Sequence, residues 1–162
     1  MHIRDATLHD LPAIVAIYNL TIPSRMVTAD TQAISVASRE RWFTEHSPDH
    51  RPLWVAEENG LTVGWLSFSS FYGRPAYNAT CELSVYLAPD QQRRGLGTAL
   101  LRRSIAYAPH IGVTTLLGFI FGHNQPSLRL FEKLGFQRWG HLPGVAVLDN
   151  VERDLIILGL RV

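Results

Sequence analysis

The sequence predicts a mixed α/β (α+β) domain, in which helices cover both faces of one mixed sheet. Segments with strand patterns alternate with segments of helical periodicity along the chain, and one strong hairpin signal joins two of the strands. A length of 162 residues suits one domain with its own core, so residues 1–162 are expected to form a single domain.

The first element is a strand over residues 1–6, where apolar and polar residues alternate. Thr7 and Asp10 have the spacing of a capping box, which predicts the start of a helix. This helix is amphipathic, because apolar residues recur at helical spacing at Leu11, Ile14, Val15 and Tyr18. A second helix is expected over residues 36–46.

Residues 53–56 and 63–68 read as two apolar strands on either side of Asn59-Gly60. This dipeptide is the strongest short hairpin signal, because both of its residues tolerate a positive φ. The next strand is expected over residues 81–87.

A helix follows from Gly95 and ends at Pro109, and residues 115–121 form a further strand. Asn124 can cap the helix after that strand, and Gly135 can end it in a left-handed conformation.

Strands over residues 136–142 and 151–160 complete the sheet, with a loop at 143–148 between them.

The composition favours a small-molecule partner. A net charge of +1 without a basic run gives no case for nucleic acid or an acidic membrane surface. There is no signal-peptide core and no apolar stretch long enough to span a bilayer, so a cytoplasmic location is expected. Cys81, the only cysteine, is better explained as a core residue than as a nucleophile. The histidines lack the paired spacing of zinc sites, and no metal is expected.

The turn at residues 92–98, with the sequence QRRGLGT, lies between a strand and a helix. Unpaired N–H groups and a partial positive charge mark a helix N-terminus, and glycines let an anion approach them closely. Arg93 and Arg94 add charge at the rim. The turn is therefore suited to bind a phosphate group, although glycines in such a loop can also be present only for the backbone conformation of the turn. Neither a dinucleotide fingerprint nor a P-loop is present.

This turn and a second block, NQPSLRLFEKLGF at residues 124–136, together resemble the acetyl-CoA-binding segments of the GNAT superfamily of N-acetyltransferases. The order of the two blocks and their separation match as well. Shorter segments are similar to the phosphinothricin and methionine sulfone acetyltransferase branch, namely residues 17–19, 42–43, 56–60 and 82–86. The resemblance covers nearly the whole chain.

The resemblance implies the acyl-CoA N-acyltransferase fold with a mostly antiparallel mixed sheet, and acetyl-CoA as the co-substrate. It also implies that backbone N–H groups of residues 84–87 stabilise the acetyl oxygen as charge develops on it. The implied cofactor-binding residues are Val85, Tyr86, Leu87, Gln92, Arg93, Arg94, Gly95, Leu96, Gly97, Thr98, Asn124 and Ser127. Asn124 and Ser127 have an equally good explanation as helix-capping residues.

Glu82 lies on the polar face of its strand, together with Thr80, Ser84 and Tyr86. A strand covered on both faces is normally apolar on both, so this face either lines a substrate cleft or is solvated. The resemblance implies that Glu82 is the catalytic general base. An amine attacks a thioester only as the neutral free base, and a carboxylate with a raised pKa accelerates such a step by about 10²–10⁴-fold.

The loop before this strand supplies candidate acceptor-binding residues. Arg74 could clamp a carboxylate or phosphinate with its planar donors, beside Phe71 and Tyr77, although a loop arginine is often only solvated. Thr28 matches a threonine of the family, and Arg25 lies in the same region.

The sequence departs from the family at two places. Phe131 stands where many relatives have a tyrosine that protonates the departing thiolate, and core packing with Leu128 and Leu134 explains it better. The thiolate would leave as an anion or be protonated by water. Residues 144–149 replace a Gly-x-Lys-Phe segment of the branch, which leaves the acceptor open.

The leading hypothesis is transfer of an acetyl group to the α-amino group of a small amino-acid-like acceptor by direct attack in a ternary complex. The acceptor would be of the phosphinothricin, methionine sulfone or methionine sulfoximine type. One alternative is acetylation of a protein N-terminus, a lysine or a polyamine, and another is an acyl-CoA-binding module without catalysis. A homodimer is expected by analogy with the family, and apolar residues at 143–148 could serve it.

Overall fold

A computed structural model describes residues 1–162. Its strands are β1 (His2–Asp5), β2 (Leu53–Glu58), β3 (Leu61–Ser70), β4 (Thr80–Leu87), β5 (Thr115–Phe121), β6 (Gln137–Leu148) and β7 (Val151–Arg161). Its α-helices are α1 (Leu11–Thr21), α2 (Glu40–Thr44), α3 (Leu96–Tyr107) and α4 (Gln125–Lys133). None of them is both long and apolar enough to cross a membrane.

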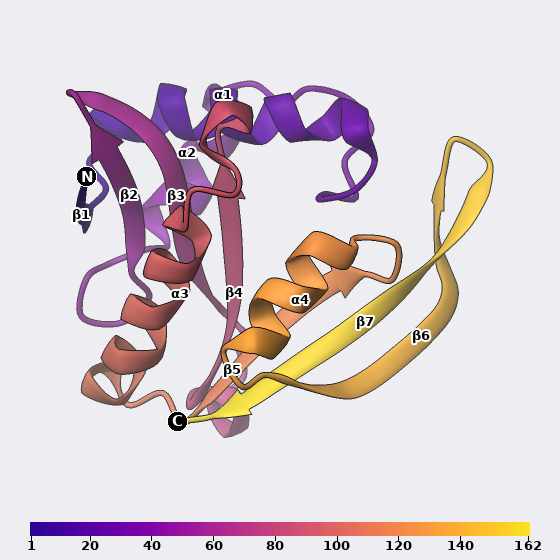
Figure 1. Cartoon of the computed structure of the whole chain (residues 1–162). Helices are drawn as coiled ribbons and strands as arrows, with labels where there is room; N and C mark the ends of the chain where they lie inside the picture. The colour runs from indigo at the N-terminus through magenta and orange to yellow at the C-terminus, as the bar shows by residue number, and fades with distance from the viewer.

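The strands form one seven-stranded sheet in the order β1-β2-β3-β4-β5-β7-β6 (Figure 1). Only β4 and β5 run parallel, and every other pair of neighbours is antiparallel. The expectation of a mixed, mostly antiparallel sheet is confirmed.

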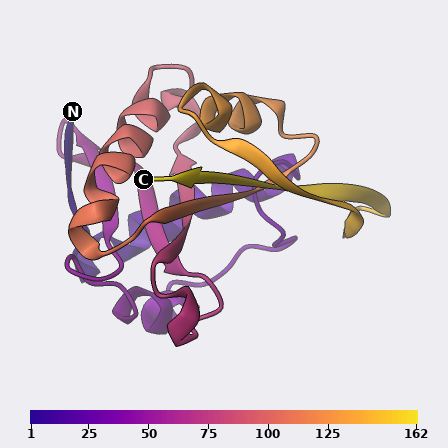
Figure 2. The same cartoon turned by 90° about the horizontal axis from the view of Figure 1, so that it is seen from below.

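Helices cover both faces of this sheet, and each face has its own core. Seen from below, α3 and α4 lie on one side of the sheet and α1 and α2 on the other (Figure 2). The larger core, under α3 and α4, includes Leu66, Phe68, Cys81 and Leu83 of the central strands. The smaller core, under α1, includes Trp65. Alternate residues of β3 and β4 therefore point to different helices.

The turn and capping residues identified in the sequence have the backbone conformations and contacts that were expected of them. Asn59 and Gly60 have φ values of 52° and 77° and close the β2–β3 hairpin. The side chain of Asn124 accepts a hydrogen bond from the Ser127 backbone N–H at 3.3 Å, and Gly135 has a φ of 96°. The helix expected over residues 36–46 is shorter, because its first turn is a 3₁₀ helix and α2 itself has five residues.

The expected loop at residues 143–148 is wrong, since β6 continues as a strand to Leu148. Its pairing with β7 is interrupted between Leu142 and Ala146, where Gly144 has a φ of 64°, and then resumes. A bulge thus accommodates a proline and a glycine within the ladder. The turn lies beyond it, at Asp149-Asn150, and the long hairpin projects from the body (Figures 1 and 2).

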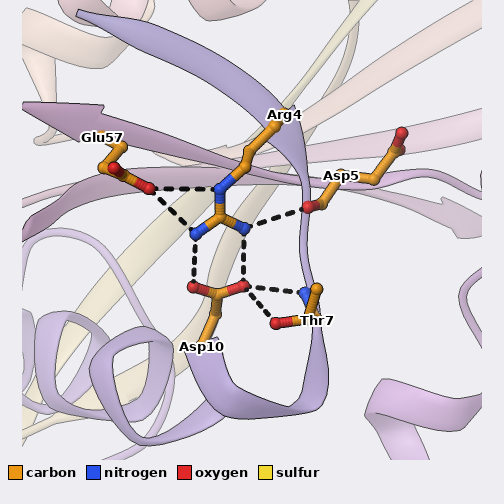
Figure 3. A network of polar contacts seen from close by, with 5 residues as sticks. All are labelled: Arg4, Asp5, Thr7, Asp10 and Glu57. Carbon is orange, nitrogen blue, oxygen red and sulfur yellow. Dashed lines mark hydrogen bonds and ion pairs between the residues drawn. The ribbon is translucent and has the colours of Figure 1, made fainter. Parts of the chain in front are cut away.

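A polar network anchors β1 to the start of the α1 segment and to β2 (Figure 3). The Arg4 guanidinium donates to both carboxylate oxygens of Asp10, at 2.8 and 2.9 Å, and to Glu57 at 3.0 and 3.1 Å. Asp10 also accepts from the backbone N–H of Thr7 at 2.7 Å, which completes the predicted capping box. The hydrogen bonds from Arg4 lower the pKa of Asp10 to about 2, against the opposing effect of burial.

Candidate functional site

The site is organised by the divergence of β4 from β5. These parallel strands pair only where residues 80–82 face residues 115–117. From Leu83 to Leu87, the edge of β4 that faces β5 has no strand partner. Backbone N–H and C=O groups need hydrogen-bond partners, so this edge is open to a ligand that carries amide groups.

A cavity of about 410 Å³, here called the larger cavity, opens along this edge between β4 and α4. It brings together most of the residues predicted to bind the cofactor, namely Val85, Tyr86, Leu87, Gln92, Arg93, Gly95, Gly97, Thr98, Asn124 and Ser127. The two separate sequence blocks therefore line one cavity.

The turn presents a helix N-terminus to the larger cavity. Gly95 has a φ of 84°, which favours glycine, and a side chain at Gly97 would stand 3.0 Å from Leu130. The first hydrogen bond of α3 is donated by the N–H of Ala99 to the carbonyl of Gly95. The N–H groups of residues 96–98 have no partner within the helix, and an anion can bind there.

Two predicted cofactor residues do not line this cavity. The Arg94 guanidinium forms an ion pair with Glu58 at 3.1 Å and donates to Gln91, so its charge is used within the protein. Leu96 is 4% exposed and belongs to the larger core. Sequence adjacency placed both in the turn, but the direction of each side chain is set by tertiary packing.

The larger cavity also contains residues that were not predicted to bind the cofactor. They come from the end of α1, from the segment after it and from the inner face of α4, and they are Thr21, Ser24, Met26, Val27, Pro126, Leu130 and Phe131. Phe131 also packs against Gly118, where a Cβ atom would approach its ring to 2.7 Å. The packing interpretation of Phe131 agrees with this contact.

Glu82 and Cys81 lie on different faces of β4. In the sheet, Glu82 is paired with Ser69 of β3 on one side and with Leu117 of β5 on the other. Its carboxylate is half-buried and makes no hydrogen bond or ion pair within the protein. Burial raises its pKa above the usual value, with no neighbouring cation to oppose the shift. Cys81 is fully buried, and burial raises the pKa of its thiol to about 11, in keeping with a core residue.

A smaller cavity, of about 130 Å³, lies on the Glu82 face of the sheet under α1 and α2. Its floor is made by Trp65, Ser67 and Ser69 of β3 with Ser84 and Tyr86 of β4. Its other walls are Ile14, Val15, Tyr18, Ile34, Arg39 and Trp42.

Tyr86 lines both cavities, so they meet at the end of β4. Its ring stacks on Trp65 with centroids 4.4 Å apart, and burial keeps its hydroxyl neutral by raising its pKa well above the usual value. The expectation that the polar face of this strand lines a cleft agrees with this arrangement.

The residues predicted to bind the acceptor are not brought to either cavity. Phe71 and Tyr77 pack against each other, and Phe71 also packs against Tyr72 and Phe119. Arg74 is exposed beside them. These side chains lie in a loop whose own aromatic cluster orients them, and the sequence showed only that the loop precedes β4.

Thr28 and Arg25 line neither cavity but bind to residues around them. Thr28 is buried and hydrogen-bonds to the hydroxyl of Tyr18, which lines the smaller cavity. Arg25 forms an ion pair with Asp149 at 3.0 Å and donates to the carbonyls of Ile22 and Thr31. Arg25 therefore links the segment after α1 to the tip of the β6–β7 hairpin.

No group of three or more histidine, cysteine, aspartate or glutamate side chains is arranged to hold a metal ion. The expected absence of a metal stays a prediction.

Comparison with known proteins identifies the family to which a chain with this sequence and fold belongs. Residues 14–136 match the model of the Acetyltransferase (GNAT) family, so the chain belongs to that family and is an acyltransferase. The expected fold and enzyme class are confirmed.

Particular relatives agree over nearly the full length. The chain is 52% identical over 160 residues to YwnH of Bacillus subtilis, provisionally named a phosphinothricin acetyltransferase, with 98% of each chain covered. It is 33% identical to the L-methionine sulfoximine/L-methionine sulfone acetyltransferase of Pseudomonas paraeruginosa, covering 98% of this chain and 93% of that one. The crystal structure of a phosphinothricin acetyltransferase from Sinorhizobium meliloti in complex with acetyl-CoA superposes with a TM-score of 0.93 at 26% identity, covering 99% and 88%.

Proposed function

We propose that this chain, acting as a single domain, transfers an acetyl group from acetyl-CoA to the α-amino group of a small amino-acid-like acceptor. The acceptor is of the phosphinothricin, methionine sulfone or methionine sulfoximine type, and it attacks directly in a ternary complex. The observation that supports the proposal most directly is the meeting of two cavities at Tyr86, one of about 410 Å³ beside the N-terminus of α3 and one of about 130 Å³. The names of the relatives support this acceptor class.

The larger cavity would hold the cofactor. The unpaired N–H groups of residues 96–98 and the guanidinium of Arg93 bind the pyrophosphate, as at other helix N-termini. The open edge of β4 at residues 85–87 pairs with the amides of pantetheine. Asn124 and Ser127 contact the cofactor from the start of α4 on the other side.

The reaction joins the amine nitrogen to the acetyl carbonyl carbon and breaks the carbon–sulfur bond. Glu82, directly or through one water, removes a proton from the acceptor amine, because its raised pKa suits a general base. Backbone N–H groups at the end of β4 stabilise the oxyanion of the tetrahedral intermediate. The thiolate leaves as an anion or takes a proton from water, since Phe131 has no proton to donate.

The size of the smaller cavity limits the acceptor. Its volume of about 130 Å³ is close to the roughly 150 Å³ of an engineered protein cavity that binds benzene. It therefore accepts one short side chain. Arg39 is the only charged residue in its lining, which disfavours a cationic polyamine or lysine.

Release of CoA thiol with a panel of amines tests the function. We expect release with phosphinothricin or methionine sulfone and little with spermidine or a lysine peptide. Glu82→Gln should lower turnover by about 10²–10⁴-fold and leave the dissociation constant of acetyl-CoA nearly unchanged. Normal turnover by this variant would refute the base assignment. Binding of acetyl-CoA without release for any amine would favour a non-catalytic module.

The proposed enzyme is a homodimer. Exposed apolar side chains gather on the β6–β7 hairpin, namely Trp139, Leu142, Val145, Val147 and Val151, of which Val147 is 63% exposed. A second copy that covers this surface removes it from water. Light scattering should give twice the chain mass, and Val145→Asp with Val147→Asp should give the monomer mass. A monomer for the unaltered chain would refute this assembly.

A further inference from the structure

The guanidinium of Arg39 is half-buried beside the smaller cavity, and its donors are unused. It makes no hydrogen bond within the protein, and its one ionic contact is Nη2 to Asp30 at 3.6 Å. Arg51, by contrast, donates to Ser70, to the carbonyl of His50 and to the carbonyl of Asn78 at 2.9–3.0 Å. A guanidinium with five donors and no hydrogen-bond partner is equipped to bind a ligand.

Aromatic side chains hold Arg39 in place. Its guanidinium carbon lies 5.2 Å from the centroid of the Tyr18 ring and 5.7 Å from that of Trp42. Such contacts with ring faces fix the orientation of a guanidinium without using its N–H groups. The hydroxyl of Tyr18 in turn hydrogen-bonds to Asp30, so the carboxylate beside Arg39 is held as well.

The floor of the smaller cavity adds hydroxyl groups that also lack partners. Ser67, Ser69 and Ser84 make no side-chain hydrogen bond within the protein, and Ser67 is only 1% exposed. Ser69 and Ser84 are half-buried. Buried hydroxyls are normally hydrogen-bonded, so the free hydroxyl of Ser67, with two more in the lining of the same cavity, suits a ligand with several oxygen atoms.

The register of β3 and β4 sets the order of the residue pairs along the floor of the smaller cavity. Trp65 faces Tyr86 and Ser69 faces Glu82, with one pair of serines between them. These two levels are about 13 Å apart along the strands, at roughly 3.3 Å per residue. An acceptor whose amine lies at the middle level, between Glu82 and the meeting point of the cavities at Tyr86, extends its side chain toward Arg39.

We propose that Arg39 and the three floor serines form a subsite for an oxyanion at the end of the acceptor's side chain. The preferred acceptor is then an α-amino acid whose short side chain ends in an acid group, and its methylene carbons lie against Trp42 and Trp65. Arg39 is a specificity-determining residue. This inference rests on the proposed function, because it uses the amine position between Glu82 and Tyr86.

Three acceptors that differ at the end of the side chain test the subsite. L-phosphinothricin carries a phosphinate, L-methionine sulfone a neutral sulfone, and L-norleucine only methylene and methyl groups. At saturating acetyl-CoA, Arg39→Gln should lower kcat/KM for phosphinothricin by about 100-fold and for the sulfone by about tenfold. The value for norleucine should stay within about threefold, because it has no oxygen atom for Arg39 to bind.

Arg41→Gln is the matched control, since this arginine lies two residues away with a side chain that is 93% exposed. It should leave all three values unchanged. Arg39→Lys keeps the charge and the stem but loses the planar fork, so the preference for phosphinothricin over norleucine should fall by about tenfold. Arg39→Lys replaces Arg39→Gln in the experiment if the latter variant does not fold. An equal loss for all three acceptors, or an unchanged preference, would overturn the subsite.

Calorimetry separates this proposal from the proposed function. Phosphinothricin is titrated into the CoA complex of the unaltered chain and into that of Arg39→Gln. No acetyl transfer takes place in either complex, because CoA carries no acetyl group. Binding that depends on Arg39, without acetylation of any acceptor, would refute the proposed function and support the subsite. Acetylation of amino acids together with equal binding by both proteins would refute the subsite alone.

Discussion

The network around Arg4 makes a quantitative prediction about stability (Figure 3). The pKa of Asp10 is lowered from 3.8 to about 2, and its side chain is only 8% exposed. At about 1.4 kcal/mol per pKa unit, this difference corresponds to about 2.5 kcal/mol of folding free energy. Asp10→Asn removes the charge and keeps the shape, so we expect it to destabilise the protein by about this amount at pH 7.

The sign of the pH dependence follows from the depressed pKa of Asp10. A carboxyl group that ionises more readily in the folded state stabilises the fold above its unfolded pKa, here 3.8. That contribution is lost as the pH falls from 3.8 through about 2. Urea unfolding curves of the unaltered protein and of Asp10→Asn should therefore differ at pH 7 and converge near pH 2.

Asp149→Asn is the control for this experiment, because Asp149 also pairs with an arginine but its side chain is 66% exposed. Exposed ion pairs contribute at most about 1 kcal/mol, so this variant should unfold nearly as the unaltered protein does. A cost for Asp10→Asn below about 0.5 kcal/mol at pH 7, or one that persists at pH 2, would show that the ion pair is not the cause.

Three further predictions concern the site and the fold. Arg93→Ala should raise the calorimetric dissociation constant of CoA by about fivefold or more, because Arg93 lines the larger cavity. Arg94→Ala should change this constant less than twofold, because the charge of Arg94 is paired with Glu58. Equal effects of the two substitutions would contradict the assignment of Arg93 alone to the cavity. Gly60→Ala should lower the free energy of unfolding by about 1 kcal/mol, because φ is 77° there, and no change in urea midpoint would argue against backbone strain. The pH profile of kcat/KM should fall on its acid side at a pKa above 4.5, and Glu82→Gln should abolish that limb. The same limb in the variant would assign it to another group.

The sequence was informative where structure depends on neighbouring residues. The Asn59-Gly60 turn, the Asn124 cap and the left-handed Gly135 follow from local backbone chemistry, and all three have the expected geometry. The same holds for the turn of residues 92–98, because a glycine-rich turn at the start of a helix exposes its N–H groups whatever the surrounding fold.

The prediction failed at the loop expected over residues 143–148, because the ladder of β6 and β7 continues past Pro143 and Gly144 through a bulge. Asp149 and Asn150 both adopt positive φ at the true turn, and residues of these two types tolerate that conformation. The sequence therefore contained a turn signal at Asp149-Asn150 that the prediction did not use.

The smaller cavity could not be predicted from spacing, because its walls come from separate elements. Tyr18 lies on α1, Arg39 directly before α2, Trp42 on α2 and Trp65 on β3. Of its lining, the sequence indicated only Ser84 and Tyr86, which share the polar face of their strand with Glu82. The acceptor residues chosen from the preceding loop were close to Glu82 in sequence, whereas most residues that line the cavity are distant from it in sequence and come together only in the fold.

The position of both cavities depends on the register of β4. Its edge is free to meet the cofactor because β5 diverges after Glu82, and one of its faces lines the smaller cavity. Its other face is fixed in the core by Cys81 and Leu83, which are 0% and 3% exposed. A slip of one residue would turn Glu82 into the core and the apolar side chains into the cavity. The buried face therefore fixes Glu82 on the same face of the sheet as the smaller cavity, next to Ser84 of its lining along that face, although Glu82 itself lines neither cavity.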